Sequence, residues 1–317
     1  MDTYAGNLLD TAVIDPSAVA SGTIDGKLLG VSTGVTMPAL VYNKSLIERV
    51  GAPQPKRSMT YDEFKDYLMV LKSKLPSGVY PMQDIGVMST NSTPFGYWTR
   101  YNGTPLYNAA DKSTAVTARD AQKYLELFAD YRRNGLVPPP DVAAGFAENN
   151  ADTSALIAGK VAIGYLYTNQ LGGYQAATTD ELELMEFPGA AATKALWQAP
   201  SQFYTVNKDS KNPEATVKFI DFLVNDPEAA LILGSNRGAS ASASARAAGA
   251  SSAADQKVLD YMQVAGPHSS AETDHVPNDT EFNSTLFLIY QRVAFGQITP
   301  AQGGQQIHEL LVRLINK

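Results

Sequence analysis

Apolar residues recur along much of the chain at the three- and four-residue spacing of amphipathic helices. Thr60 and Glu63 have the spacing of a capping box, and an apolar stripe begins directly after them. Asn212-Pro213 and Asp226-Pro227 each place a cap residue before a proline suited to the first helical position. The pattern predicts helices at residues 44–50, 61–71, 117–134, 213–225, 227–233, 281–295 and 300–314. In the helix after Pro213, the residues expected on the buried face are Ala215, Phe219, Phe222 and Leu223.

Short apolar segments between these helices predict β-strands at residues 28–32, 39–42 and 161–167, with a tight turn at Asp25-Gly26. Glutamates alternate with apolar residues from position 181, which indicates one solvent-facing side of a strand. The carboxylates expected on that side are Glu181, Glu183 and Glu186. Helices that alternate with isolated strands predict an α/β or mixed α+β fold.

Two further segments carry local signals. Asp152 is placed to cap a short helix that ends at Gly159. Residues 239–254 hold nine Ala and five Ser, a low-complexity composition that we interpret as a solvated loop leading into a helix.

Composition narrows the function classes. A chain of 317 residues has room for two domains or one large domain. The formal net charge of −7 argues against nucleic acid as a partner, because phosphate binding needs clustered cations. The absence of cysteine excludes disulfides and thiolate chemistry, and three histidines make His-rich metal sites improbable, so no cofactor is expected. We find no membrane-spanning apolar stretch, and the first residues have no basic and apolar regions of a signal peptide.

Known catalytic motifs are absent from the sequence. There is no glycine-rich phosphate loop, no HExxH and no GxSxG. This favours binding over catalysis, and we do not expect an enzyme. A carbohydrate lyase or hydrolase remains the alternative, for which the candidate acids are Glu148, Asp152 and Asp84.

Aromatic side chains gather with amides, hydroxyls and arginine in three segments, residues 95–103, 165–170 and 196–204. Both tryptophans lie in these segments, and Tyr165 and Tyr167 share one face of the predicted strand. Rings stack on the C–H faces of sugars, while amides and arginine bind hydroxyls, so the chemistry suits a polyhydroxylated ligand.

The string DGKLLGVSTGVTMPALVYNKSLIERVG at residues 25–51 resembles the signature of family 1 extracellular solute-binding proteins of carbohydrate ABC transporters. TYDEFKDYLMVL, GKVAIGYLYTNQL, SKNPEATVKFIDFLVNDPEA, SNRGASAS and VAFGQITPAQGGQQIHELL continue the likeness in order over most of the chain. The family begins with a signal or lipoprotein sequence and further strand–helix units that are missing here, so we expect an incomplete first lobe. The turn before residue 245 is also richer in Ala and Ser than the family's pattern.

The resemblance implies a periplasmic-binding-protein-like (type II), two-lobed Venus-flytrap fold with a mono- or oligosaccharide in an aromatic-lined cleft. One lobe would comprise residues 1–42 and 204–244, and the other residues 43–203 and 245–317. ABC permease subunits would be partners, and the location would be the periplasm or, through a missing lipid anchor, the extracellular membrane face. A non-transport sensor is a further alternative. The candidate ligand-binding residues are Met37, Trp98, Arg100, Tyr165, Tyr167, Asn169, Gln170, Trp197, Gln202 and Arg237.

Overall fold

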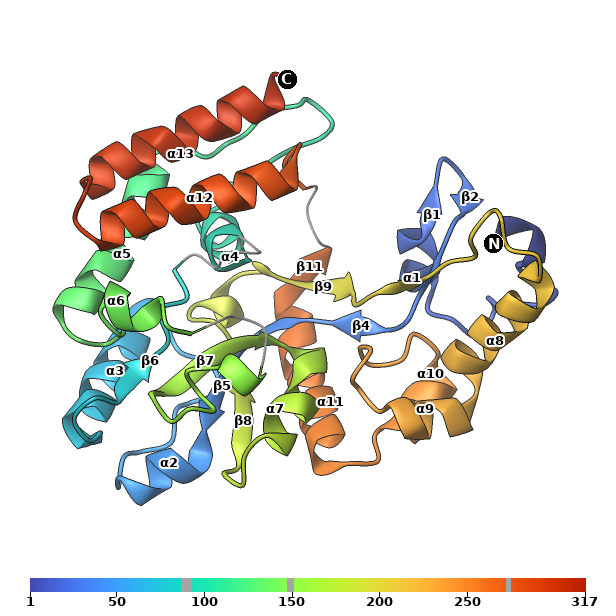
Figure 1. The fold of residues 1–317 in the computed structure, drawn as a ribbon, viewed down its shortest axis with the longest axis horizontal. Helices are drawn as coiled ribbons and strands as arrows, with labels where there is room; N and C mark the ends of the chain where they lie inside the picture. Colours follow the sequence, from blue (N-terminus) through green and yellow to red (C-terminus); the bar gives the residue numbers. More distant parts are fainter. Residues whose placement is uncertain (87–92, 147–150, 272–274) are drawn as a thin grey trace. The chain divides into compact units, whose positions relative to one another are not determined.

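The chain forms two compact units in the computed structural model, which describes residues 1–86, 93–146, 151–271 and 275–317 (Figure 1). Unit 1 comprises Met1–Pro38, Leu166–Ala176 and Gln198–Gly266, and unit 2 comprises Ala39–Tyr165, Ala177–Trp197 and Pro267–Lys317. Within unit 1, α11 (Ala253–Ala265) packs on α7 (Leu171–Ala176), and the Tyr261 hydroxyl donates to the Pro38 carbonyl at 2.8 Å.

A four-stranded sheet forms the centre of unit 2. Its strand order is β6 (Tyr80–Met82), β7 (Val161–Tyr167), β5 (Pro38–Asn43) and β8 (Leu182–Met185). β6 runs parallel to β7, and β5 pairs with β8 in antiparallel register. β5 and β7 are buried along nearly their whole length, as expected of inner strands covered on both faces. The strands predicted at residues 39–42 and 161–167 are therefore confirmed.

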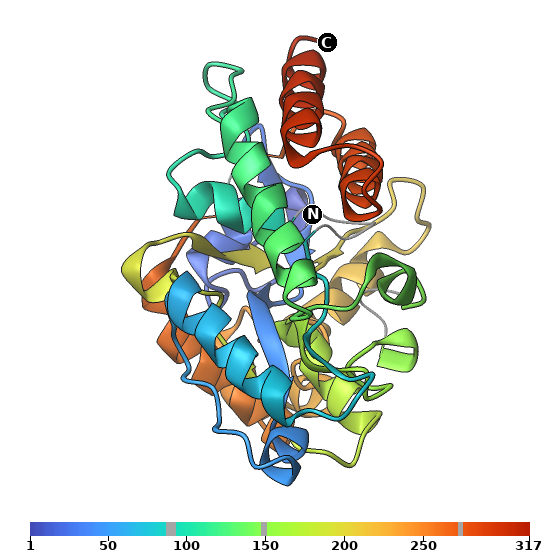
Figure 2. The same ribbon diagram turned by 90° about the vertical axis from the view of Figure 1, so that its left-hand side faces the viewer.

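Helices surround this sheet, and α13 (Pro300–Ile315) packs against α5 (Ala118–Arg133) and α12 (Asp279–Ala294) (Figures 1 and 2). Thr60 and Glu63 cap α3 (Tyr61–Lys74) reciprocally, as their spacing predicts. The other helices of this unit are α2 (Lys44–Arg49), α4 (Thr93–Tyr101) and α6 (Pro140–Ala143).

Unit 1 is built from short strands and helices around a small core. Asp25 and Gly26 have φ of 50° and 73°, which confirms the tight turn. The strand predicted at residues 28–32 is instead divided between two pairs of strands. The strands are β1 (Thr23–Ile24), β2 (Lys27–Leu28), β3 (Val31–Ser32), β4 (Val35–Thr36) and β10 (Phe203–Tyr204). The helices, besides α7 and α11, are α1 (Pro16–Ser21), α8 (Pro213–Asn225), α9 (Pro227–Leu233) and α10 (Ala243–Gly249).

A further strand, β9 (Leu196–Pro200), lies between β4 and β11 (Ser269–Ala271) in a three-stranded sheet. β4 and β9 are antiparallel, with Val35 opposite Pro200 and Thr36 opposite Ala199. This pairing matters for function because it brings the chain around residue 36 beside the chain around residue 200.

The predicted buried face of α8 is wrong. Phe219 and Phe222 are 59% and 40% exposed, whereas Val217, Ile220 and Val224 are buried in the core of unit 1. Both sets of residues have helical spacing, so periodicity alone could not choose between them. Packing against α1 and the neighbouring strands decides which residues of α8 are buried.

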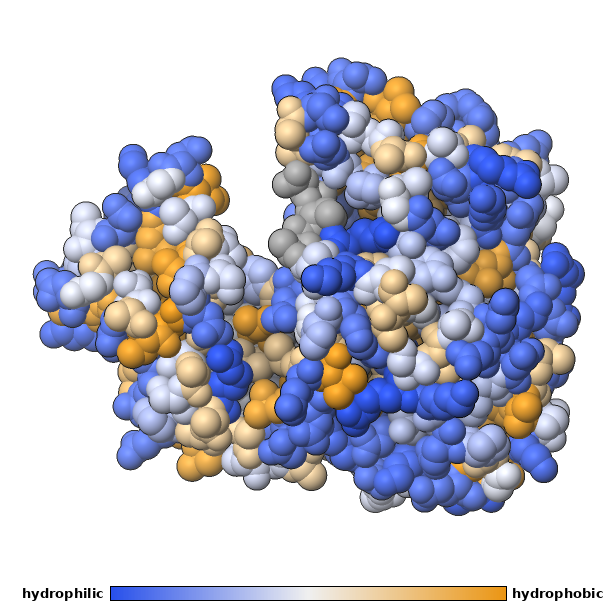
Figure 3. Space-filling model, turned by 180° about the vertical axis from the view of Figure 1, so that it is seen from behind, coloured by the Kyte–Doolittle hydropathy of each residue, from blue (hydrophilic) through white to orange (hydrophobic). Residues whose placement is uncertain are grey.

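The surface of the molecule is mixed. Figure 3, seen from behind, shows apolar surface broken into patches by hydrophilic residues.

Two other local predictions also fail. Asp152 belongs to a single 3-10 turn, Ala151–Thr153, and no α-helix leads from it to Gly159. The Ala/Ser-rich stretch forms α10 and the start of α11 rather than a solvated loop, and Ala241 and Ala245 are fully buried. Small side chains allow α10 to approach α9 closely, since a Cβ on Gly249 of α10 would lie 3.1 Å from the Ala230 carbonyl oxygen.

Candidate ligand-binding site

Four segments that are distant in the sequence meet in unit 1. The backbone N–H of Val35 donates to the carbonyl of Ala239, and that of Ser201 donates to the carbonyl of Gly34, both at 2.8 Å. The Thr168 N–H donates to the Met37 carbonyl at 3.0 Å. We call the side chains that these segments bring together the polar cluster. Its members are Thr33, Thr36, Thr168, Asn169, Gln202, Asn236 and Arg237.

Threonines fix the amide of Asn169. The Thr36 hydroxyl donates to Asn169 Oδ1 at 3.0 Å and shares a 3.1 Å hydrogen bond with the hydroxyl of the fully buried Thr168. Asn169 is half-buried, and its Nδ2 has no partner within the described part of the chain. This leaves an oriented donor at the end of β7.

Gln202 and Arg237 form the exposed part of the polar cluster. Arg237 Nη1 donates to Gln202 Oε1 at 2.8 Å, and the Thr33 hydroxyl donates to the Arg237 carbonyl at 2.6 Å. Asn236 lies beside α7, since a Cβ on Gly172 would be 3.1 Å from its Oδ1. The cluster therefore presents amide and guanidinium groups held by backbone contacts.

Asp255 anchors the loop that carries Arg237. Its Oδ1 accepts from the N–H and hydroxyl of Ser235 at 2.7 and 2.6 Å, and its Oδ2 accepts from the Ser252 hydroxyl at 2.5 Å. Burial acts to raise the pKa of the Asp255 carboxyl, but hydrogen bonds from the side chains and backbone of Ser235 and Ser252 outweigh it and lower that pKa.

Unit 2 carries a group of half-buried rings. Tyr61 packs edge-on against Trp98 with 5.3 Å between ring centroids, and against Tyr101 at 5.1 Å. We call these three residues the ring cluster. Tyr61 and Tyr101 did not emerge from the sequence as ligand candidates, although Tyr101 lies in the first aromatic segment. Each of the three residues is partly exposed, and Tyr61 also lines an apolar pocket of unit 2.

Arg100 and Trp197 are brought together, but as parts of the framework. Arg100 Nε donates to the Ala195 carbonyl at 2.8 Å and its Nη2 to Ser270 Oγ at 2.5 Å, while its guanidinium lies 5.3 Å from the Trp197 ring. Trp197 is only 6% exposed, and its Nε1 has no hydrogen-bond partner among the described residues. The pair ties α4 to β9 and β11.

Other candidates are also buried. Met37 is 0% exposed, and Tyr165 is 2% exposed and packs edge-on against Phe187. Both side chains are part of the core in this structure. Tyr167 and Gln170 are half-buried, and the Tyr167 N–H donates to Gln170 Oε1 at 2.8 Å.

The acids considered for catalysis have structural partners or lie elsewhere. Asp84 is buried and paired with Arg132 at 2.7 Å. Glu186 is not solvent-facing as predicted: its side chain is fully buried, with Oε1 2.6 Å from His268 Nδ1. Glu148 lies outside the described residues. In the described ranges, no three or more His, Cys, Asp or Glu side chains are grouped to hold a metal.

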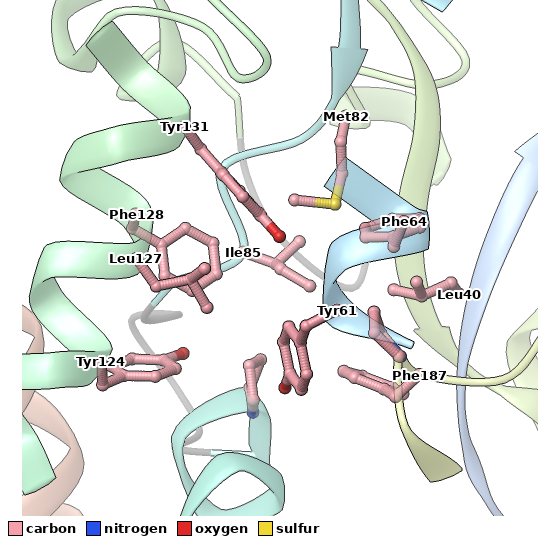
Figure 4. A pocket seen from close by; sticks show the side chains of 12 residues that line it. Leu40, Tyr61, Phe64, Met82, Ile85, Tyr124, Leu127, Phe128, Tyr131 and Phe187 are labelled. Carbon is pink, nitrogen blue, oxygen red and sulfur yellow. The ribbon is translucent and has the colours of Figure 1, made fainter. Parts of the chain in front are cut away.

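A separate pocket in unit 2 is apolar. Its cavity volume is ≈ 30 Å³, and the buried Tyr131 hydroxyl, which has no partner among the described residues, points into it (Figure 4). Burial raises the pKa of Tyr131 and Tyr124. The other lining side chains are overwhelmingly hydrocarbon and could not satisfy sugar hydroxyls. The pocket is lined by Leu40, Tyr61, Phe64, Met82, Ile85, Pro94, Tyr124, Leu127, Phe128, Tyr131, Phe187 and Pro188.

The fold is shared with known binding proteins. A family 1 extracellular solute-binding protein from Alicyclobacillus acidocaldarius is 26% identical with a TM-score of 0.78, covering 100% of this chain and 79% of that chain. An oligogalacturonide-binding protein from Yersinia enterocolitica, in complex with saturated digalacturonic acid, is 23% identical with a TM-score of 0.81, covering 97% and 78%.

UgpB from Mycobacterium tuberculosis, in complex with glycerophosphocholine, is 16% identical with a TM-score of 0.74, covering 97% of this chain and 75% of that chain. Two designed esterases also share the fold. These likenesses confirm the α/β, periplasmic-binding-protein-like fold class. In the described ranges, no helix combines the length and apolar character needed to cross a bilayer.

The family comparison covers most of the sequence. The model of the bacterial extracellular solute-binding protein family matches residues 2–258. The protein therefore belongs to the bacterial extracellular solute-binding proteins, a family of ABC-transporter binding components, as the resemblance of its sequence motifs predicts.

Proposed function

We propose that this solute-binding protein delivers a mono- or oligosaccharide to an ABC importer and carries out no chemistry on it. The observation that supports this most directly is the polar cluster of unit 1. It combines an oriented Asn169 amide with Gln202 and Arg237 on a framework of backbone hydrogen bonds. Amide and guanidinium groups at fixed positions can bind several hydroxyls at once.

The ring cluster of unit 2 supplies the complementary chemistry. Tyr61, Trp98 and Tyr101 are partly exposed, and their apolar faces suit the C–H faces of a pyranose. We propose Tyr167, Asn169, Gln170, Gln202 and Arg237 as the ligand-binding residues of unit 1 and Trp98 as the ligand-binding residue of unit 2. Met37, Arg100, Tyr165 and Trp197 would support these residues from behind.

The acids support binding rather than hydrolysis. A glycosidase needs two carboxyl groups about 5–10 Å apart that flank the substrate. Asp84 is tied to Arg132, and Glu186 is buried beside His268. Neither carboxylate is placed to work on a bound saccharide.

The family suggests the cellular setting. Extracellular solute-binding proteins work outside the cytoplasmic membrane, and their ligands pass to ABC permeases. We propose permease subunits as partners and the periplasm or, through a lipid anchor, the extracellular membrane face as the location. The relative that holds saturated digalacturonic acid lends support to a saccharide as the ligand.

Isothermal titration calorimetry against a panel of mono- and oligosaccharides tests the proposal. We expect at least one saccharide to bind, and Asn169→Ala and Gln202→Ala each to weaken its binding about two- to tenfold, the value of one hydrogen bond. Gln256→Ala, which removes an exposed amide on α11, is the matched control and should bind as the parent does. Binding of a peptide or an inorganic ion, with no response to any saccharide, would contradict the proposal.

A further inference from the structure

The segments that form the polar cluster are almost free of charge. Residues 28–43, 161–179, 195–207 and 229–245 contain no Asp, Glu or Lys, and their one charged side chain is Arg237. Charged residues make up 18% of the whole chain, so these segments are strongly depleted in charge. A ligand here meets neutral amides and hydroxyls together with one cation.

The two arginines of unit 1, Arg237 and Arg246, differ in their ion pairs. Arg246 pairs with Asp15 at 2.8 Å, whereas Arg237 is exposed and makes no ion pair with any described residue. Its Nη1 is occupied by Gln202 Oε1, an uncharged acceptor. The remaining guanidinium donors are open to a ligand oxygen.

Hydrogen bonds fix the backbone that carries this guanidinium. The Arg237 carbonyl accepts the Thr33 hydroxyl, and the N–H of Gly238 donates to the Ser235 carbonyl at 2.9 Å. Asp255 holds Ser235 from behind through the side-chain and backbone bonds described above. A cation on a pinned loop loses less conformational entropy on binding than one on a free chain.

We propose that the saccharide is anionic and that Arg237 determines this specificity by binding a carboxylate of the sugar. This rests on the proposed function. An arginine–carboxylate hydrogen bond is about twice as strong as a neutral one. Because the polar cluster has no carboxylate of its own, it neither neutralises Arg237 nor repels an anionic sugar.

Calorimetry with matched sugar pairs tests this inference. The probes are uronic acid disaccharides and the neutral disaccharides of the same linkage. We expect the protein to bind at least one acid about tenfold or more tighter than its neutral counterpart. Arg237→Gln should weaken binding of the acid about tenfold more than binding of its neutral counterpart, which abolishes the difference, whereas Arg237→Lys should retain part of it. Lys218→Gln on α8 removes an exposed positive charge elsewhere in unit 1 and should keep the full difference.

The outcomes separate the two proposals. If neutral disaccharides bind as tightly as the acids, or if Arg237→Gln keeps the preference, the role of Arg237 is overturned while saccharide binding stands. If no member of either set binds, saccharide binding itself fails. Thermal unfolding of each variant establishes that Arg237→Gln is folded, and Arg237→Lys gives an independent comparison that keeps the charge.

Discussion

Individual buried charges in this protein are stabilised by specific partners. Asp84 has 4% of its side chain exposed and Arg132 has 10%, and Tyr290 binds both of them. Asp255 is enclosed by the hydroxyls and N–H groups of two serines. Asp84 is a candidate acid in the sequence, but its partners show it to be part of the framework.

We predict that Asp84→Asn lowers the free energy of unfolding by about 3–5 kcal/mol, because it leaves the Arg132 guanidinium buried without its counterion. Urea denaturation followed by circular dichroism measures the change. The control is Asp141→Asn, an exposed carboxylate on α6, which should stay within about 0.5 kcal/mol. A loss below about 1 kcal/mol for Asp84→Asn would show that the pair contributes little.

Asp255 predicts a pH dependence. Since the hydrogen bonds lower its pKa in the folded state, its stabilising effect is fully present above the ordinary carboxyl pKa of about 3.9 and is lost as pH falls toward the lowered value. Asp255→Asn should cost about 1–3 kcal/mol at pH 7 and reduce the fall in stability below pH 4. Denaturation at pH 7 and pH 3.5 measures both effects. Asp260→Asn, an exposed site on the same helix, should behave as the parent at both pH values.

The close packing of helix α13 on α5 depends on two glycines of α13. A Cβ on Gly304 would lie 2.5 Å from the Ala118 carbonyl and 2.7 Å from the Gln122 nitrogen, both backbone atoms of α5. A Cβ on Gly303 would meet Leu125 and Val293 at 2.7 Å. The two glycines therefore allow α13 to approach α5 at backbone distance.

We predict that Gly304→Ala destabilises the protein by about 1–3 kcal/mol, although alanine favours a helix by about 1 kcal/mol over glycine. The clash is with backbone, so α13 has to move away from α5. Gly173→Ala provides the contrast, since nothing lies within 4 Å of its added Cβ in α7. That substitution should be neutral or stabilising in thermal denaturation. A stabilising Gly304→Ala would mean that the helices can separate without loss.

For individual helices, the sequence predicts the element well where a capping residue and an apolar stripe indicate the same start. The caps of α3 and α5 and the central strand β7 could be placed from residue types alone. The face of α8 could not, because Phe219 and Val217 both fit a helical period and only tertiary packing selects one. The prediction for Glu186 was wrong because this residue breaks the alternation of Glu181 and Glu183. It has the same parity as the buried Leu182 and Leu184, and it lies buried beside His268 just after β8 ends.

The whole molecule has an uneven surface. Many of its exposed large apolar side chains lie in unit 1, including Phe219 and Phe222 on α8 and Leu231 and Ile232 on α9. Phe219 and Phe222 stack with 6.4 Å between centroids. An exposed group of this kind favours self-association.

We predict that the double substitution Phe219→Ser, Phe222→Ser reduces the binding of the dye ANS and lowers self-association in sedimentation velocity. The free energy of unfolding should change by only about 0.5 kcal/mol, because these rings are not in the core. Met69→Ser, Val70→Ser on α3 of unit 2 is a control pair with similar exposure. Equal effects of the two double variants would argue against any special property of unit 1.

Only part of the candidate site could be predicted from the sequence. The segments around residues 98, 167 and 202 were identified by their mixture of rings and amides, but the sequence could not separate surface from support. Trp98 is half-buried and Trp197 is almost fully buried, although both lie in the same kind of composition. Asn236 and Asp255 were missed, because their importance comes from contacts between segments that are far apart in the chain.

The location of the two indoles has a practical consequence for spectroscopy. Trp98 and Trp197 both belong to unit 2. Intrinsic emission excited at the red edge of indole absorption therefore reports mainly on unit 2. It senses unit 1 only through β9, whose residues after Trp197 pair with β4. A ligand that engages Arg237 without disturbing the rings would be invisible to the same measurement, so a reporter introduced near Asn236 is needed to follow it.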